Sequence, residues 1–438
     1  MIKIKYPSRK ELNKIVQKKL RYTIKYAYKY SPFYHELFKL NSILPDDIKN
    51  VDDLKRIPIV DSNTIKQNQP PTINEFKFLS ASISDIQTIH ETGGTTGIGK
   101  SLFYTKDDWK RMAIKSARAI KAMNPTKHDL ILNCIGHGVG SSTFMAIEGA
   151  KLVGVPIITA AFSPFPPRYQ LIEKYKPTIL HHIFSMAKRL AMEMKETGMS
   201  PENSSIKKLW VAGEMMSKKM KIHLEKLWNA ELFNLYGSTE AGAIAFECQE
   251  HIGLHVNEDS VLISARDPSH PEEIVENENG LCIITNLLEP NSNTGNVLIN
   301  FNTEDIVKII ETKKCGCGNP FIQIDYPYRK IDLIQIENRR ILKSFFDDIV
   351  IDLLEVNKNL TGEWEVILQK VSNFTKLNLR LETVYKEKIT KKLKIPRKLQ
   401  LLLKNLEKDN IKLTFELMLK GQLEIFKKPG KPKRVIFK

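Results

Sequence analysis

Hydrophobic positions near the start of the chain recur every four residues. Leu12, Val16, Leu20 and Ile24 follow this spacing, with Lys and Arg between them. Such spacing gathers apolar side chains on one face of a helix. It predicts an amphipathic helix with a buried stripe and a solvated basic face. Further on, we expect the chain to be loop-rich around SPFYHELF and DSNTIKQNQPPTINEF.

From Asp129 the pattern changes to short apolar runs separated by helical stretches. The runs of strand length are LILNCIG, VPIITAAF, PTILHHI and KKLWVAG, and helices are expected over residues 186–197 and 217–228. This alternation indicates a layered α/β domain with a mostly parallel sheet. After Cys248 the texture becomes β-rich, in VLISA, GLCIITNL, GNVLINF and FIQID.

A third texture begins past Tyr328. LTGEWEVILQKV and KLNLRLETV predict two strands around a turn, and RKLQLLLKNLEKDNIKLTFEL predicts a helix followed by a strand. The fold class is therefore α/β. We expect a large N-terminal multi-layer α/β domain with mixed sheets over residues 1–328 and a small C-terminal α+β domain over residues 329–438.

Composition is that of a globular protein, with 42% hydrophobic and 27% charged residues in a chain of 438. The start has no apolar run of signal-peptide length, and no window approaches the length of uninterrupted apolar sequence that a membrane span needs. The sequence thus predicts a cytoplasmic protein with no membrane segment.

The net charge of +17 lies at the two ends of the chain. Residues 1–40 carry 11 basic and 2 acidic side chains, and residues 386–438 carry 17 and 5. The basic ends leave open an alternative function, a zinc-containing protein that binds nucleic acid. The split of the charge between the ends and the lack of an aromatic-basic RNA motif make nucleic acid a disfavoured partner.

One stretch, ETGGTTGIGKSL, matches two different phosphate-binding loops. Read from Gly94 to Ser101, it fits the pattern of a P-loop phosphotransferase. Read from Thr92, it resembles the Gly/Thr-rich loop of enzymes that adenylate carboxylic acids. A P-loop leads directly into a helix, whereas LFYT predicts a strand here, with a helix capped by Thr105 after it. The second type of loop is favoured.

Further motifs follow the loop in a fixed order: LWVAGEMMS, LFNLYGSTEAG, NFNTEDIVKI, YRKIDLIQI and GKPKR. With SPFYHELF and DLKRIPIV before them, the set resembles the adenylate-forming ligase superfamily and, within it, the phenylacetate–CoA ligase-like branch. The resemblance spans essentially the whole chain. It implies that ATP activates an aryl or small acyl carboxylic acid to an acyl adenylate with release of pyrophosphate. The acyl group would then pass to a thiol such as coenzyme A or to another acceptor.

The resemblance also assigns a nucleotide site. The Tyr236 ring would stack on adenine, the Thr239 hydroxyl would meet the α-phosphate, and the Glu240 carboxylate would hold Mg²⁺. Asp305 would receive the ribose hydroxyls, because one carboxylate accepts from both. The other nucleotide-binding residues that it implies are Thr92, Gly93, Gly94, Thr95, Thr96 and Gly97 of the loop, with Gly213, Glu214, Gly237 and Ser238.

The same resemblance makes residues 329–438 a mobile lid. Arg329 would reach the nucleotide beside a hinge at Asp332, and Lys431 would neutralise charge during adenylation, with Lys433 as a close rival. The segment CIGHGVGSS, which contains His137 and Gly138, would line the acid pocket. A structural role for His137 is equally open.

A group of cysteines and histidines, separate from the nucleotide motifs, forms a candidate metal site. A Cys-x-Cys-Gly element at Cys315 and Cys317 follows CQEHIGLH by about sixty residues and supplies, with Cys248, three thiols for tetrahedral Zn²⁺. Some relatives carry a structural zinc, and their histidine matches His255, which we prefer to His251. The two other cysteines, Cys134 and Cys282, are expected to be buried apolar residues.

The chain departs from the branch at two places. The loop has Ile98-Gly99 where the branch has Lys-Pro, with Lys100 only after them. After the hinge, Ile331 stands where an acid is expected, and no glycine soon follows Ile336. A glycine would allow close approach of an acceptor arm. Adenylation is therefore better supported than transfer to coenzyme A, and a carrier-protein thiol or an amine stays open as the acceptor. A homodimer is allowed.

Overall fold

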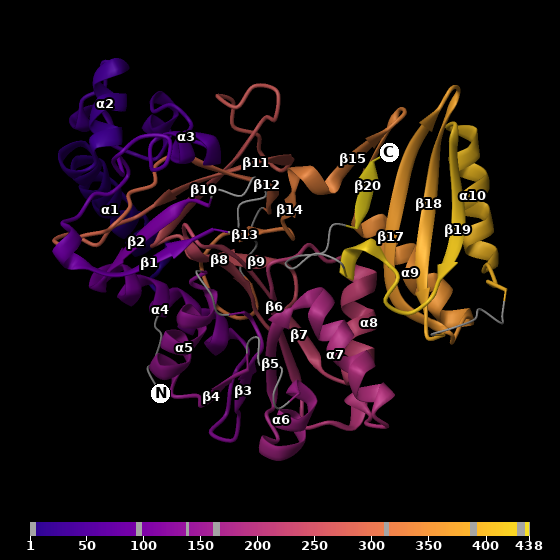
Figure 1. Ribbon diagram of the computed structural model, residues 1–438. Coiled ribbons are helices and arrows are strands. Elements are labelled where there is room, and N and C mark those ends of the chain that lie inside the picture. The colour runs from indigo at the N-terminus through magenta and orange to yellow at the C-terminus, as the bar shows by residue number, and fades with distance from the viewer. Residues whose placement is uncertain are drawn as a thin grey trace. The chain divides into compact units, whose positions relative to one another are not determined.

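The computed structural model describes residues 6–92, 99–136, 140–160, 167–310, 315–385, 392–426 and 434–437 (Figure 1). The chain divides into two compact units. One comprises Met1–Glu214 with Leu227–Tyr328, and the other comprises Met215–Lys226 with Arg329–Lys438. The chain enters the second unit for good after Tyr328, and residues 215–226 also group with that unit.

The first unit begins with the predicted amphipathic helix, α1 (Arg9–Tyr30). Its stripe is buried: Leu12, Leu20 and Ile24 are fully covered, and Val16 is 7% exposed. The Ser8 side chain accepts from the Glu11 backbone amide, and the Glu11 carboxylate accepts from Ser8, so a capping box starts the helix. The periodicity and the cap together explain why this segment is helical.

The expectation of loops is wrong for SPFYHELF and for the segment DSNTIKQ, whereas residues 68–76 of DSNTIKQNQPPTINEF form no helix or strand. The first forms α2 (Pro32–Leu40) and the second forms α3 (Ser62–Gln67). Ser31 caps α2, and Pro32 occupies the first helical position, where a missing amide hydrogen has no cost. The Asp61 carboxylate caps α3 by accepting from the Thr64 amide at 2.7 Å. Ser-Pro and Asp-Ser are common in turns, but in this chain they start helices.

A mixed sheet of twelve strands dominates the first unit, as the fold class predicts. Eleven of them follow the order β10-β11-β12-β13-β9-β8-β7-β6-β5-β3-β4, and β4, β3, β5, β6 and β7 run parallel. Their bounds are β3 Ile131–Asn133, β4 Ile157–Thr159, β5 Ile179–Ile183, β6 Lys208–Ala212, β7 Glu231–Ser238, β8 Gly242–Glu247, β9 Leu254–Val256, β10 Val261–Arg266, β11 Asn279–Asn286, β12 Phe301–Ile310 and β13 Gln323–Ile324. The chain passes to the second unit at β14 (Tyr328–Arg329).

Helices cover the parallel strands. Figure 1 shows α4 (Lys106–Ala122) and α5 (Ser142–Val153) on one side and α7 (Phe184–Glu196) on the other. Ile131 pairs with Ile179 and Trp210 pairs with Phe233 on neighbouring strands, and the four form a core with the first two helices. The remaining helices, α6 (Arg168–Tyr175) and α8 (Lys218–Trp228), also lie between consecutive strands in the chain. The predicted α/β alternation is confirmed.

The segment GNVLINF is not the strand that its apolar residues suggest. Strand β12 begins only at Phe301, although Val297, Leu298 and Ile299 are buried. Asn296 accepts from the Phe103 amide at 2.6 Å through its side chain. A Cβ at Gly295 would lie 2.0 Å from the Phe103 carbonyl oxygen, so only glycine permits this approach. The segment GNVLINF is apolar because its side chains are buried, although most of it does not pair as a strand.

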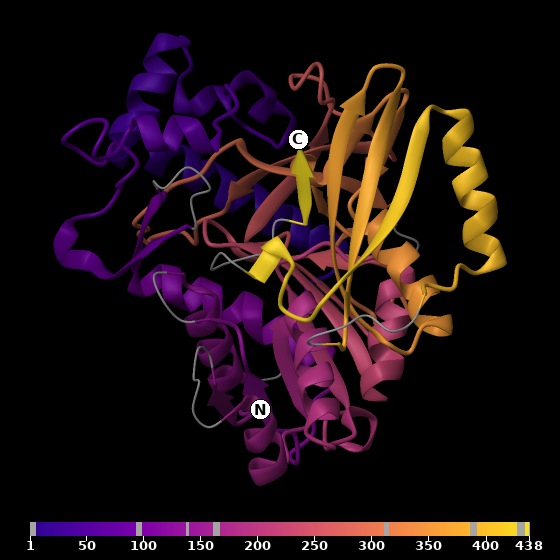
Figure 2. The ribbon, with the colours of Figure 1, turned by 45° about the vertical axis from the view of Figure 1, so that its right-hand side comes forward.

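The second unit is the predicted α+β module. Its four-stranded sheet has the order β19-β18-β17-β20, and a hairpin of β15 and β16 precedes it. In Figure 2, α10 lies beside β19. The bounds are β15 Leu333–Ile336, β16 Arg339–Leu342, α9 Ser344–Val356, β17 Leu360–Val371, β18 Phe374–Thr383, α10 Arg397–Lys408, β19 Ile411–Met418 and β20 Val435–Phe437. Trp364, Phe346 and Leu377 are fully covered in its core.

Among the residues that the structure describes, none of the helices combines the length and the apolar character that crossing a bilayer requires.

A buried histidine on β5 predicts acid sensitivity. His181 stacks on Trp210 at a centroid distance of 3.7 Å, and burial lowers the pKa of His181 to about 4. As the pH falls from about 6.5 to 4, His181 therefore becomes protonated in the unfolded chain but stays neutral in the native state. The free energy of unfolding decreases in that pH window. One such group contributes a slope of about 1.4 kcal/mol per pH unit.

Urea denaturation of the wild type and His181→Gln at pH 7, 6 and 5 checks this expectation. The variant should lose less free energy of unfolding per pH unit than the wild type. Equal slopes for the two proteins would contradict the assignment.

Candidate active site

The root of the predicted phosphate loop is a closed hairpin. Strand β1 (Ile86–Glu91) runs antiparallel to β2 (Ser101–Thr105). Beyond β1, the Thr92 amide donates to the Lys100 carbonyl at 3.1 Å, and the Lys100 amide donates to the Thr92 hydroxyl at 3.0 Å. Thr92 thus holds the base of the loop. The predicted residues Gly93, Gly94, Thr95, Thr96 and Gly97 lie outside the described residues.

Gln69 and Gly99 also hold the loop base, and neither of them was assigned to the site from the sequence. The Gln69 side chain donates to the Gly99 carbonyl at 2.9 Å and accepts from the Ser101 amide at 3.0 Å. A Cβ at Gly99 would lie 2.5 Å from the Thr92 carbonyl oxygen, so this position requires glycine. No sequence pattern links Gln69 to a loop thirty residues later.

The strand after the loop contradicts the P-loop phosphotransferase. Ser101–Thr105 is strand β2, and α4 begins only at Lys106. The Thr105 hydroxyl accepts from the Asp108 amide at 3.2 Å, the predicted cap, within a capping box. A helix that starts five residues past the motif cannot direct its N-terminus at phosphates in that loop.

Tyr236 and Asp305 meet across the sheet. The Tyr236 hydroxyl donates to the Asp305 carboxylate at 2.7 Å, although the two residues lie on β7 and β12. Burial raises the pKa of the Tyr236 hydroxyl well above its usual value, so the phenol remains a donor. The sequence predicted both residues for one nucleotide site, and the sheet brings them together.

The turn from Thr239 to Ala241 is held by side chains from α4 and its approach. The Tyr104 hydroxyl donates to the Thr239 carbonyl, and the Lys115 ammonium donates to the Ala241 carbonyl. Gly237 lies within the β7–β8 hairpin, where a Cβ would come within 2.4 Å of a carbonyl oxygen. Sequence reasoning missed both Tyr104 and Lys115, because nothing in their local pattern distinguishes them from core positions.

Glu240 lies within this turn, and its side chain is 6% exposed. Its carboxylate pairs with the Lys100 ammonium at 2.5 Å, and its carbonyl accepts from the Asn286 amide at 3.1 Å. The Ser238 hydroxyl accepts from the Ala241 amide at 3.3 Å. Predicted residues of the loop base and of the YGSTE motif therefore lie together.

Gly213 and Glu214 stand at the end of β6. Gly213 has a φ of +81°, which favours glycine. The Glu214 carboxylate accepts from both the amide and the hydroxyl of Ser185 at 2.9 Å, at the start of α7. A carboxylate at a helix N-terminus is electrostatically favourable. The side chain therefore anchors α7, a task that the resemblance did not assign to it.

Other predicted residues belong to the second unit or lie outside the described residues. Arg329 is exposed and begins the second unit, and Asp332 lies 3.8 Å from the Lys343 ammonium in the same unit. The remaining predicted residues, His137, Gly138, Lys431 and Lys433, lie outside the described residues.

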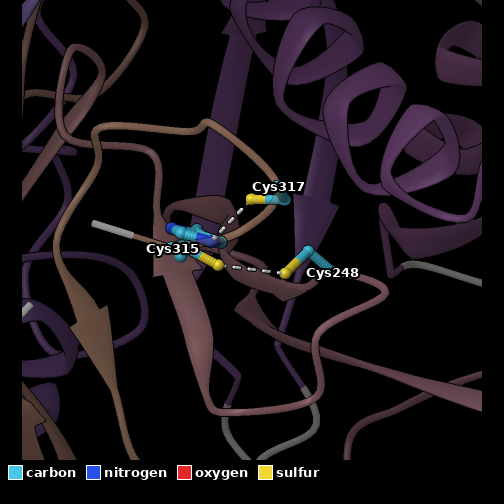
Figure 3. A group of neighbouring side chains, drawn as sticks. Cys248, Cys315 and Cys317 are labelled. Atoms are coloured by element: carbon cyan, nitrogen blue, oxygen red, sulfur yellow. Dashed lines mark hydrogen bonds between the residues drawn. The ribbon is translucent and has the colours of Figure 1, made fainter. Parts of the chain in front are cut away.

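The predicted thiol cluster forms in the first unit (Figure 3). Ligand atoms of Cys248, His255, Cys315 and Cys317 all lie within 4.8 Å of one another. The sulfurs of Cys248 and Cys315 are 3.7 Å apart, and the Cys317 sulfur lies 3.3 Å from His255 Nε2. Zinc–sulfur bonds of about 2.3 Å in a tetrahedron place sulfurs about 3.8 Å apart, so the separation fits this metal.

The two candidate histidines have different surroundings. His255 Nδ1 lies 3.1 Å from the Phe321 carbonyl, which leaves Nε2 directed at the thiols. His251 instead contacts the carboxylates of Glu247 and Glu231, each at 2.9 Å. The structure places His255, and not His251, in the cluster. Cys134 and Cys282 are buried away from it, as expected.

Residues 35–273, more than half of the chain, match the family model of AMP-binding enzymes. The chain belongs to this family of AMP-binding enzymes. We therefore do not retain the alternative of a non-enzymatic protein that binds nucleic acid.

Curated relatives indicate the branch of the superfamily that this chain resembles. Phenylacetate–coenzyme A ligase from Thermus thermophilus is 22% identical over 378 residues, covering 85% of this chain and 82% of the relative. The enzyme of that name from Pseudomonas putida is 23% identical over 368 residues, covering 83% and 80%. The expected branch of adenylate-forming ligases is confirmed.

Solved structures share the fold. A 2-hydroxyisobutyryl-CoA ligase in complex with 2-HIB-AMP has a TM-score of 0.81 and 18% identity, covering 99% of this chain and 91% of the other. Anthranilate CoA ligase in complex with anthranoyl-AMP has a TM-score of 0.52 and 13% identity, covering 83% and 68%. The α/β fold class is confirmed.

The loop base predicts the effect of Gly99→Ala. The added methyl group would meet the Thr92 carbonyl and separate the two sides of the loop. We expect the Kd for ATP, measured by isothermal titration calorimetry, to rise about tenfold or more, which corresponds to the loss of one or two hydrogen bonds. The melting temperature should change little, since Gly99 is only partly buried. An unchanged Kd would contradict the assigned role of the loop.

Proposed function

We propose that this chain uses ATP and Mg²⁺ to convert a carboxylic acid, aryl or small acyl, into an acyl adenylate with release of pyrophosphate. The observation that carries the proposal is the meeting of Tyr236 with Asp305, 69 positions later, in a chain of the AMP-binding family. In this proposal Asp305 accepts from the ribose hydroxyls and Tyr236 lies against adenine. The loop rooted at Thr92 holds the β- and γ-phosphates.

Two anions must approach each other in this reaction, so cations and oriented donors have to offset their repulsion. Glu240 offers the hard oxygen ligand that Mg²⁺ prefers, with nucleotide phosphates and water as the other ligands. Thr239 precedes it and offers a hydroxyl to the α-phosphate. For the second unit we propose that Arg329 and Lys431 act as the cations of a lid.

For the acceptor we propose coenzyme A first. Four curated relatives are phenylacetate–coenzyme A ligases, and this supports a thiol ester as the product. The hairpin after the hinge has Glu337 at a φ of +49°, where a glycine would be unstrained. Its carboxylate also accepts from the Thr375 hydroxyl at 2.5 Å. Because this turn is bulkier than a glycine turn, a carrier-protein thiol is the second candidate.

We propose that Zn²⁺ binds to Cys248, His255, Cys315 and Cys317 and has a structural role. Four ligands from the protein would close the tetrahedron and leave no open position for a substrate. The cluster connects β8, β9 and the segment before β13, which are neighbours in the sheet. The Asn319 amide also donates to the Cys317 sulfur at 3.5 Å, which stabilises a thiolate.

Acid-dependent exchange of pyrophosphate into ATP tests the activity. With a panel of aryl and short-chain acids, we expect exchange with at least one. With that acid, Asp305→Asn should lower the kcat/KM for ATP in the exchange reaction about ten- to a hundredfold, which is the range for the loss of a hydrogen bond to a charged group. The exposed neighbour Glu304→Gln is the matched control and should retain activity. Formation of ADP and phosphate in place of exchange would rule out this reaction.

Metal analysis tests the zinc site. Protein purified under reducing conditions without chelators should contain about one zinc ion per chain. Cys317→Ser should lose most of it and melt at a lower temperature, because three buried ligands lose the ion that joins them. Cys134→Ala, at a buried cysteine outside the cluster, should retain the metal. A zinc-free wild type of full stability would disprove this assignment.

A further inference from the structure

Lys115 is a buried cation without a role in the proposed reaction. It lies in the middle of α4, and only 3% of the residue is exposed. Its ammonium donates to the Ala241 carbonyl, in the turn that follows the YGSTE motif. Burial of an ammonium group is costly unless its surroundings compensate the charge. The presence of a lysine at this position therefore requires a reason other than packing.

The carboxylates near Lys115 are committed to other partners. Asp259 accepts from Arg118 through two hydrogen bonds of 2.7 and 2.6 Å, and Asp108 pairs with Arg111. Burial and the Arg111 guanidinium lower the pKa of Lys115 to about 7. The ammonium is thus electrostatically unfavourable for folding, which is typical of charged groups at functional sites.

Three successive carbonyl groups of the turn each accept from a different side chain. The pairs, with the donor first, are Tyr104 with Thr239, Asn286 with Glu240 and Lys115 with Ala241. The three donors come from β2, β11 and α4. Because a peptide group is planar, a carbonyl that is held in one direction also fixes the amide of the next residue. The three donors together therefore determine the orientation of the turn.

The turn is also packed tightly against α4. Gly242, the next residue, has a φ of +65°, and a Cβ there would lie 2.2 Å from the Met112 sulfur, three residues before Lys115. Ala241 is fully covered. Without the lysine, its carbonyl would be a buried acceptor with no donor from α4, which is unfavourable. We expect the turn to shift when this hydrogen bond is lost.

We propose that Lys115 is a positioning residue for nucleotide binding and that it acts together with Tyr104 by fixing the turn between them. The carbonyls that they hold stand on either side of Glu240 in the chain. The two donors therefore set the positions of Thr239 and Glu240. This inference rests on the proposed function, which gives Thr239 to the α-phosphate and Glu240 to Mg²⁺. A displacement of about 1 Å is enough to impair such groups severely.

Binding of an ATP analogue with a methylene bridge between the α- and β-phosphates tests this coupling. Its Kd in the presence of Mg²⁺ is measured by isothermal titration calorimetry. Lys115→Met and Tyr104→Phe should each raise the Kd about tenfold, as expected for the loss of one buried hydrogen bond. The double variant should raise it by clearly less than the product of the two, because a turn freed at one end already moves. Lys115→Gln, which keeps a neutral donor, should recover part of the lost affinity.

A matched control and the opposite outcomes make the test decisive. Lys110→Met removes an exposed lysine of the same helix and should bind the analogue like the wild type. If Lys115→Met does not fold, Lys115→Gln takes its place in the double variant. A purely structural role would lower the melting temperature and leave the Kd unchanged, and this result would overturn the proposal. Effects on the Kd that multiply fully in the double variant would overturn it as well.

The binding assay needs no carboxylic acid and no turnover. A failure of acid activation alone therefore appears in the pyrophosphate exchange assay, whereas a failure of the present inference appears as unchanged or independent effects on analogue binding.

Discussion

The buried ion pair between Lys100 and Glu240 is the contact on which the arrangement of this site depends. It joins the β1–β2 hairpin, at the base of the proposed phosphate loop, to the turn after β7, which carries the YGSTE motif. A buried charge is tolerated only with a partner, so the two segments cannot separate without leaving a carboxylate unpaired. Tyr104 and Lys115 hold the same turn through its carbonyl oxygens. The site is thereby shaped before any ligand binds.

The large sheet determines what else reaches this turn. The parallel strands end at one edge, where crevices for ligands form in open α/β sheets. Tyr236 lies near the end of β7, and β12 brings Asp305 to the Tyr236 hydroxyl. The thiol cluster lies between neighbouring strands of the same sheet, from β8 to β13. A zinc ion there would fix the relative position of these strands.

Periodic and local signals were sufficient for much of the fold. The stripe of Leu12 and Ile24, the cap at Thr105 and the alternating runs from Asp129 each depend on residues close in the sequence, and each is confirmed. The helices at Pro32 and Ser62 were missed because Ser-Pro and Asp-Ser start turns as well as helices. GNVLINF was misread because burial without strand pairing selects the same apolar residues as a strand.

The site was predictable only where resemblance named its residues. Tyr236, Asp305 and Glu240 came from ordered motifs, whereas Gln69, Tyr104 and Lys115 act through contacts with segments distant in the sequence. Such contacts have no local signature. The side chain of Glu214 shows the converse, since its motif suggested the nucleotide while its carboxylate anchors a helix.

Transfer of ¹⁸O tests the central claim most directly. An acid that supports pyrophosphate exchange is labelled with ¹⁸O in its carboxylate and turned over with ATP, Mg²⁺ and coenzyme A. Attack of the carboxylate on the α-phosphorus places one labelled oxygen in AMP, which mass spectrometry detects as a gain of about 2 Da in that product. The account predicts labelled AMP and unlabelled pyrophosphate. Label in inorganic phosphate with formation of ADP, or AMP without label, would contradict it.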